Sequence, residues 1–186
     1  PFLQAEWGIT SWKSLSPDDE SRRGMELTDE YWPEDVANTA LVVFEVGGDV
    51  ELLSEEHLRS LHAFSKEILS IENAGYVYTY AHFDEGMSEQ EMVDFWDESK
   101  DGEMPPQQAQ MVAILREYHL ENTVGDGVVM IVVGIDGEQT SEESREVVNA
   151  IRALEGREEQ FGGVSTVYVA GMAAYNQDVL DAVIES

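Results

Sequence analysis

Four runs of apolar or alternating residues, each bounded by glycine or polar turns, predict β-strands. They cover residues 39–46, 76–82, 128–133 and 164–170. The first (TALVVFEV) and the third (VVMIVV) are almost continuously apolar, which is typical of strands buried on both faces. In the second (YVYTYAH), tyrosines alternate with smaller residues, which favours a strand with two unlike faces near a sheet edge.

Apolar residues at helical spacing follow the first and third of these runs. After Ser54, Leu58 and Leu61 begin an apolar stripe with charged residues around it, which predicts an amphipathic helix. A second helix is expected from Thr140, because Glu143 three positions later completes a capping-box pattern. Each long apolar run is therefore followed by a helix.

Residues 84–124 have a helical pattern and match neither half of the chain. Ser88 and Glu91 form a capping-box signature for one helix, and Pro105 suits the first turn of another. The second helix has apolar residues at helical spacing: Met111, Ile114, Leu115 and Tyr118. We interpret this segment as a helical insertion that covers part of the fold.

An internal repeat relates residues 39–82 to residues 128–170. Both contain an apolar strand, a glycine-aspartate turn, a Ser-Glu-Glu helix start, a helix and a mixed strand. Two such βαβ units predict an α+β fold, the ferredoxin-like split βαβ sandwich, with the first and third strands central. The helices of that fold cover only one face of the sheet. The other face needs a cover, which either the insertion or a neighbouring domain would supply.

The remaining sequence sets the expected domain organisation. Residues 1–35 carry Trp7, Trp12 and Trp32 without a sustained period, so we expect an irregular segment whose aromatic residues dock on the body. Residues 36–186 are expected to form a single domain. The chain begins without methionine and ends inside an apolar helical stripe, so we expect it to be a piece of a longer polypeptide.

The charge of the chain changes what it is expected to bind. Its 39 acidic residues against 10 basic ones give a net charge of −29, far beyond the magnitude of roughly 2 to 8 usual for a small domain. At molar salt the Debye length falls to about 3 Å, which removes most of the self-repulsion. We therefore expect a salt-adapted, halophilic protein. Nucleic acid and anionic lipid are excluded as expected partners, because both require a positive surface.

The sequence indicates no catalytic residue and no cofactor site. It contains no cysteine, no phosphate-binding loop, no dinucleotide fingerprint and no nucleophile elbow. His57 and His62 lie five positions apart, which does not place two ligands on one helix face. His82 and Asp84 would make an acid/base pair, but in so acidic a chain such neighbours arise by chance.

No metal site is expected either. The carboxylate clusters at residues 18–20 and at Asp84 and Glu85 lack the spaced oxygen ligands of a calcium loop. A solvated acidic surface explains them better.

The aromatic row Tyr76, Tyr78 and Tyr80 is the strongest candidate for a surface site, together with Trp96 on the inserted helix. Alternation places the three tyrosines on one strand face, where they would line an apolar substrate groove or a domain interface. The alternative is ordinary packing beneath the inserted helices. The sequence leaves both open.

The order of motifs resembles the extracytoplasmic porter domain of the RND (resistance-nodulation-cell division) superfamily, in particular its MMPL-like exporters. The resemblance covers about residues 25–184 and begins with residues 32–35 (WPED) leading into an apolar strand. Gly48-Asp49 and a Leu-Ser helix start follow. At the carboxyl end, VVMIVVGIDGE and VYVAGMAAYNQDVLDAV match the family pattern of a strand that ends in glycine before a helix.

The resemblance implies a transport function. Such domains belong to membrane proteins that are usually driven by the proton gradient and export hydrophobic or lipid-like compounds. This chain would be a non-catalytic domain on the extracytoplasmic face of the cell membrane, shaping the substrate path. Its partners would be the membrane helices and other domains of its own transporter, with homo-oligomerisation as a further option.

Two alternatives fit the same pattern. One is a soluble ferredoxin-like module that senses a small ligand and regulates an enzyme, although such modules are shorter and seldom carry an insertion like residues 84–124. The other is an accessory domain of the SecD/SecF protein-translocation type. An enzyme using His82 and nearby carboxylates is the weakest interpretation.

Overall fold

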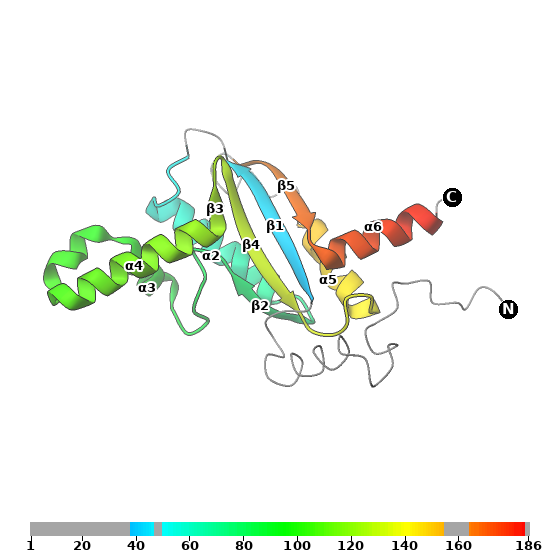
Figure 1. Cartoon of the computed structure of the whole chain (residues 1–186), viewed down its shortest axis with the longest axis horizontal. Helices are drawn as coiled ribbons and strands as arrows, with labels where there is room; N and C mark the ends of the chain where they lie inside the picture. The colour runs from blue at the N-terminus through cyan, green and yellow to red at the C-terminus, as the bar shows by residue number, and fades with distance from the viewer. Residues whose placement is uncertain (1–37, 47–49, 155–163, 185–186) are drawn as a thin grey trace, which may run out of the picture.

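The computed structural model describes residues 38–46, 50–154 and 164–184, which form an α+β fold with one open antiparallel sheet (Figure 1). The segment 1–35 and its tryptophans lie outside the described residues. The strands are β1 (Thr39–Val46), β2 (Ala74–Tyr78), β3 (Val124–Gly125), β4 (Val128–Ile135) and β5 (Val164–Ala170). The helices are α2 (Glu55–Leu69), α3 (Glu89–Trp96), the 3-10 helix η2 (Glu98–Glu103), α4 (Pro106–Thr123), α5 (Glu142–Arg152) and α6 (Met172–Ile184).

The two continuously apolar strands occupy the centre of the sheet. The strand order is β2-β4-β1-β5, with the two-residue strand β3 paired to β4. All pairings are antiparallel, and β1 meets β4 with Val42 opposite Ile131. The predicted central positions of the first and third runs are therefore confirmed.

One face of the sheet carries the hydrophobic core. Figure 1 shows α2 and α5 behind the strands, and alternate side chains of β1 and β4, such as Val42, Phe44 and Ile131, are buried on this side. The Phe44 ring meets Phe64 of α2 edge to face at a centroid distance of 5.6 Å. Because each fully buried aliphatic or aromatic side chain contributes about 1.5–3 kcal/mol, this face is the main source of stability.

The other face of the sheet, which we call the open face, has no helix across it within the described residues. Leu41 and Val43 of β1, and Met130 and Val132 of β4, are only partly buried there. The prediction that both strands are buried on both faces is therefore wrong for the described part of the chain. The reason is that the insertion lies beside the sheet, with α4 leading away from it in Figure 1.

The insertion is helical, as predicted, and one set of its polar contacts joins its own helices. Ser88 caps α3 in a complete capping box with Glu91. The guanidinium group of Arg116 on α4 donates two hydrogen bonds to the Asp101 carboxylate, at 2.7 and 2.9 Å, and its Nε donates to the carbonyl oxygen of Phe95. These bonds tie α3, η2 and α4 into one unit.

The second strand is shorter than predicted. β2 ends at Tyr78, and the chain then turns, with Thr79 and His82 joined by two backbone hydrogen bonds of 2.8 and 3.0 Å. The backbone N–H of Tyr80 donates to the Thr123 hydroxyl at 3.2 Å and so does not extend a strand ladder. The expected strand over residues 76–82 is therefore wrong beyond Tyr78.

The start of α5 also differs from the prediction by one residue. Ser141, not Thr140, has the extended backbone of an N-cap, and its hydroxyl accepts a hydrogen bond from the Ser144 backbone at 3.2 Å. The helix begins at Glu142, so Thr140 lies one position too early to cap it.

Candidate functional site

Tyr76 and Tyr78 lie on the open face of the sheet. Val77 between them points into the core and is buried, so its two neighbours point the other way. The Tyr76 ring covers Gly134 of β4, because a Cβ built on that glycine would lie 2.0 Å from Cε1 of the ring. This close approach fixes the position of Tyr76 and requires glycine beneath it.

Tyr78 connects the open face to the insertion. Its hydroxyl lies 2.9 Å from Nδ1 of His119 on α4. Burial, with a smaller contribution from the nearby Tyr118 phenol, raises the pKa of Tyr78. Burial also lowers the pKa of His119, whose ring stacks on Phe83 at a centroid distance of 4.0 Å. The hydrogen bond therefore joins a neutral phenol to a neutral imidazole near pH 7.

Tyr80 and Trp96 do not share this surface. Tyr80 is fully buried, and its ring meets Trp96 edge to face at 5.9 Å. The indole N–H of Trp96 donates to the Tyr80 carbonyl at 3.0 Å, and the Tyr80 hydroxyl donates to the Leu52 carbonyl at 3.3 Å. Burial raises the pKa of Tyr80. The predicted row of three tyrosines is wrong at Tyr80, because the turn after Tyr78 sends this side chain into the core.

The open face around Tyr76 and Tyr78 is largely apolar. It extends over β1 and β4 to β5, where Tyr168 has 49% of its surface exposed. The remaining apolar members are partly buried: Leu41, Val43, Val128, Met130 and Val132. A contiguous apolar surface of this kind is typical of an interaction site.

The apolar stripe on α4 also points outward. Its members are 40–57% exposed: Met111, Ile114, Leu115 and Tyr118. The buried positions of the helix are instead the polar residues Arg116, His119 and Thr123. The insertion contributes Met92 and Trp96 of α3 to the core, but within the described residues the α4 stripe does not pack on the fold, since polar anchors hold this helix in place.

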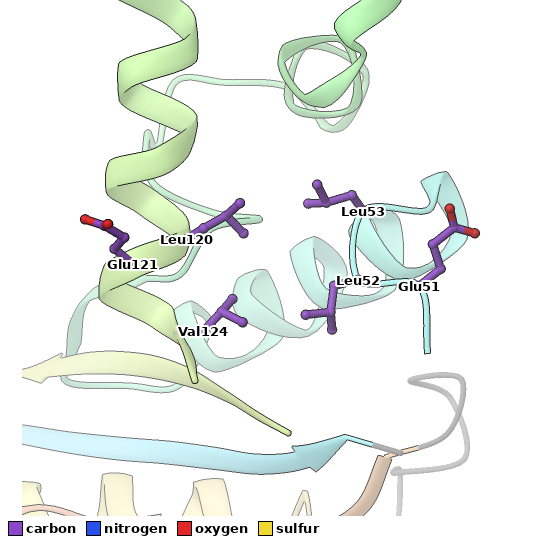
Figure 2. A pocket seen from close by; sticks show the side chains of 6 residues that line it. All are labelled: Glu51, Leu52, Leu53, Leu120, Glu121 and Val124. Atoms are coloured by element: carbon purple, nitrogen blue, oxygen red, sulfur yellow. The ribbon is translucent and has the colours of Figure 1, made fainter. Parts of the chain in front are cut away.

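An apolar pocket lies between α4 and the segment before α2 (Figure 2). Its volume is about 630 Å³, and its walls are Glu51, Leu52, Leu53, Leu120, Glu121 and Val124. Figure 2 shows Leu53 and Leu120 pointing toward each other across the pocket, while the two carboxylates point away from it. No pattern in the sequence predicts this pocket directly. Leu52 and Leu53 come directly before the N-cap Ser54, so they belong to neither the strand nor the helix pattern. Two apolar residues at such a place could have indicated an apolar surface there.

Two of the histidines, His62 and His82, pack against each other inside the fold. His62 and His82 are buried with ring centroids 5.1 Å apart, and Nδ1 of His62 lies 2.9 Å from the Ala81 carbonyl oxygen. Burial, followed by the charges of His62 and Lys66, lowers the pKa of His82 to about 4, so this ring is neutral at pH 7. No hydrogen bond joins His82 to Asp84 within the described residues.

Asp84 has a local role in its turn. Its carboxylate accepts a hydrogen bond from the backbone of Gly86 at 2.8 Å. Among the described residues, no three metal-ligating side chains gather into a cluster, and the carboxylates at 18–20 lie outside that part of the chain. Over the same described residues, none of the helices has the length and apolar content needed to cross a membrane.

Comparison of the sequence with models of known protein families gives no match. Comparison with curated proteins gives no match either.

Proposed function

We propose that the chain is a non-catalytic, ferredoxin-like domain of a membrane exporter of the RND superfamily, of the MMPL-like type, and that it acts on the extracytoplasmic side. Two features support the fold assignment. The strand order is β2-β4-β1-β5, and the helices that follow β1 and β4, α2 and α5, pack on one face. This is the arrangement that two βαβ units in series produce.

The observation that carries the proposal is the open face. Its apolar side chains on β1 and β4 face away from α2 and α5 and are only partly buried. Monomeric soluble proteins rarely expose large contiguous apolar surfaces, and those that exist bind partners or ligands. A domain inside a larger transporter has the neighbours that would cover this face or pass a hydrophobic compound along it.

In this role the domain contacts other parts of the transporter and guides the substrate, and it catalyses no reaction. The polar groups best placed for chemistry are engaged in the fold: Tyr78 with His119, and Arg116 with Asp101. The apolar surfaces match hydrophobic or lipid-like compounds as substrates. The net charge of −29 fits an external domain in concentrated salt, where screening weakens the repulsion among its carboxylates.

The reading frame that encodes this chain tests the proposal. We expect an apolar segment of about 20 residues shortly before Pro1 and several more after Ser186, because each membrane-spanning helix needs about that length. Polar flanks on both sides, without such a segment, would refute the transporter role.

A second candidate, a soluble domain that senses a small ligand, is favoured by the pocket between α4 and the segment before α2. Its volume of about 630 Å³ lies within the 300–1,000 Å³ typical of small-molecule sites. If this function holds, the chain by itself should bind an apolar fluorescent probe with one-to-one stoichiometry, and Leu120→Ser should weaken that binding. Soluble flanks combined with such binding would favour the sensor over the exporter.

A further inference from the structure

The pocket of Figure 2 shares lining residues with two neighbouring hollows. Two further hollows, of about 430 and 640 Å³, adjoin it where the start of α2, η2 and α4 meet. Leu53 lines both the first and the second hollow, Leu120 the first and the third, and Glu98 the second and the third. We call the three hollows that share these lining residues the α4 groove.

The floor of the α4 groove is apolar in the first hollow and partly apolar in the second, and it is held in place from below, whereas the third hollow is lined mainly by charged side chains. Leu53, 41% exposed, stands at its centre, with Trp96 and Leu120 on either side. The Trp96 indole is fixed by its hydrogen bond to the Tyr80 carbonyl, and the Tyr80 hydroxyl in turn binds the backbone of Leu52. The floor is thus formed before any partner arrives, which lowers the entropy cost of binding.

The rim of the α4 groove is negative. Glu51, Glu98, Glu117 and Glu121 are exposed along it, and none of the four has an ion-pair partner within the described residues. The guanidinium group that reaches the groove, that of Arg116, is occupied by its two hydrogen bonds to Asp101. An apolar floor inside a rim of unpaired carboxylates has a definite complement: apolar groups flanked by cations.

We propose that the α4 groove binds a basic amphipathic helix from a partner protein. Such a helix would place apolar side chains at positions i, i+3, i+4 and i+7 on the leucines and Trp96 of the floor, and its Lys or Arg residues beside the rim carboxylates. The inference does not depend on the proposed transporter role.

Charge selects this occupant over others. A second copy of the chain also carries a charge of −29, and anionic lipid is negative as well, so both are repelled by the rim. A single small molecule would occupy one hollow and leave the other two empty, because each hollow alone has the volume of a small-ligand site. A helix of several turns would contact lining residues of all three.

Binding of designed peptides to the full chain tests the proposal. The probe is a fluorescein-labelled helix of about 18 residues, made of leucine at core spacing and lysine elsewhere. The comparison peptides are a shuffled sequence of the same composition and a leucine-glutamate helix. Anisotropy titrations use salt concentrations at which circular dichroism shows the chain folded. We expect the leucine-lysine helix to bind at least about tenfold more tightly than either comparison peptide.

Three variants locate the site. Leu53→Ser removes an exposed apolar contact and should weaken binding about tenfold or more. Glu98→Gln with Glu121→Gln should weaken it about threefold to tenfold and reduce its dependence on salt. The matched control, Glu142→Gln with Glu146→Gln on α5, removes the same charge from a helix beside β5, at the opposite edge of the sheet from β2 and α2, and should leave the affinity within about twofold.

Several results would overturn the proposal. They are no binding of the leucine-lysine helix, equal binding of the shuffled peptide, or an unchanged affinity in Leu53→Ser. Equal losses in the rim and α5 double variants would mean general attraction to an acidic chain. Sedimentation that shows a dimer abolished by Leu53→Ser would assign the groove to a second copy instead.

Discussion

The hydroxyl of Tyr78 on β2 and Nδ1 of His119 on α4 lie 2.9 Å apart, and this contact ties the insertion to the sheet. The two residues are separated by 41 positions in the sequence. Because burial favours the neutral form of both groups, the contact is a hydrogen bond between neutral partners and not an ion pair. It fixes α4 beside the open face.

Removal of this hydrogen bond should destabilise the chain measurably. Tyr78→Phe keeps the ring and leaves the imidazole nitrogen without its partner, so we expect a loss of about 1 kcal/mol in the free energy of unfolding. Denaturant titration at a fixed molar salt concentration measures it. Tyr168→Phe on the exposed edge strand is the matched control, and equal effects of the two substitutions would contradict the assignment.

Gly134 should tolerate no side chain. A Cβ there would lie 2.0 Å from the Tyr76 ring, so Gly134→Ala forces the ring off the strand, and we expect a loss of about 1–3 kcal/mol in the free energy of unfolding. Gly134→Ala should lower the free energy of unfolding much less when it is added to Tyr76→Ala than when it is added to the natural sequence, because the ring is then absent. The same denaturant titrations measure each variant.

Gly102 provides the control for that substitution. No heavy atom lies within 4 Å of a Cβ built on this glycine in η2, so Gly102→Ala should change the stability by no more than about 0.5 kcal/mol. If both alanine variants were equally stable, the close contact between Tyr76 and Gly134 would be refuted.

The central strands and Tyr80 show what the sequence could and could not predict. The apolar runs at 39–46 and 128–133 and the Ser88 capping box are local signals, and the structure confirms them. The position of Tyr80 depends on its contacts with Thr123 and Leu52, which are distant in the chain. No local pattern records such contacts, so alternation alone placed Tyr80 on the wrong side.

The insertion gives the same lesson in another form. Apolar residues recur at helical spacing along α4, but this spacing does not show which side of the helix faces inward. The inward side is set by Arg116 and His119, because Arg116 binds Asp101 on η2 and His119 binds Tyr78 on β2. The α4 groove was missed for a related reason, since its floor joins residues from three separate elements.

Protonation of His82 should destabilise the chain in mild acid. Its pKa is about 4 when folded, against 6.5 as the ordinary value, so between these limits the unfolded chain binds more protons. The free energy of unfolding should therefore fall as the pH drops from 6.5, with the His82 contribution complete below pH 4. The contribution should reach roughly 3 kcal/mol.

The variant His82→Gln isolates this contribution from that of the carboxylates. Stability curves of the two proteins between pH 7 and pH 4, in the same salt, should converge as the pH falls. Parallel curves would show that His82 has an ordinary pKa in the folded chain.

Salt should stabilise the folded chain. With 39 acidic and 10 basic residues, compaction brings like charges together, and screening at molar ionic strength reduces the cost. Unfolding followed against potassium chloride should show stability rising from dilute to molar salt. Stability that is flat or decreasing over that range would contradict salt adaptation.

Export by the intact protein tests whether the open face contacts other parts of a transporter. In Val43→Ser with Val132→Ser, the isolated chain should lose less than about 2 kcal/mol, because both side chains are already partly exposed. The matched control is Glu142→Gln with Glu146→Gln. The measurement is efflux of a hydrophobic fluorescent compound at equal protein abundance. We expect the open-face variant to lose most of its efflux and the control to lose none. Unchanged efflux in both variants would refute the contact.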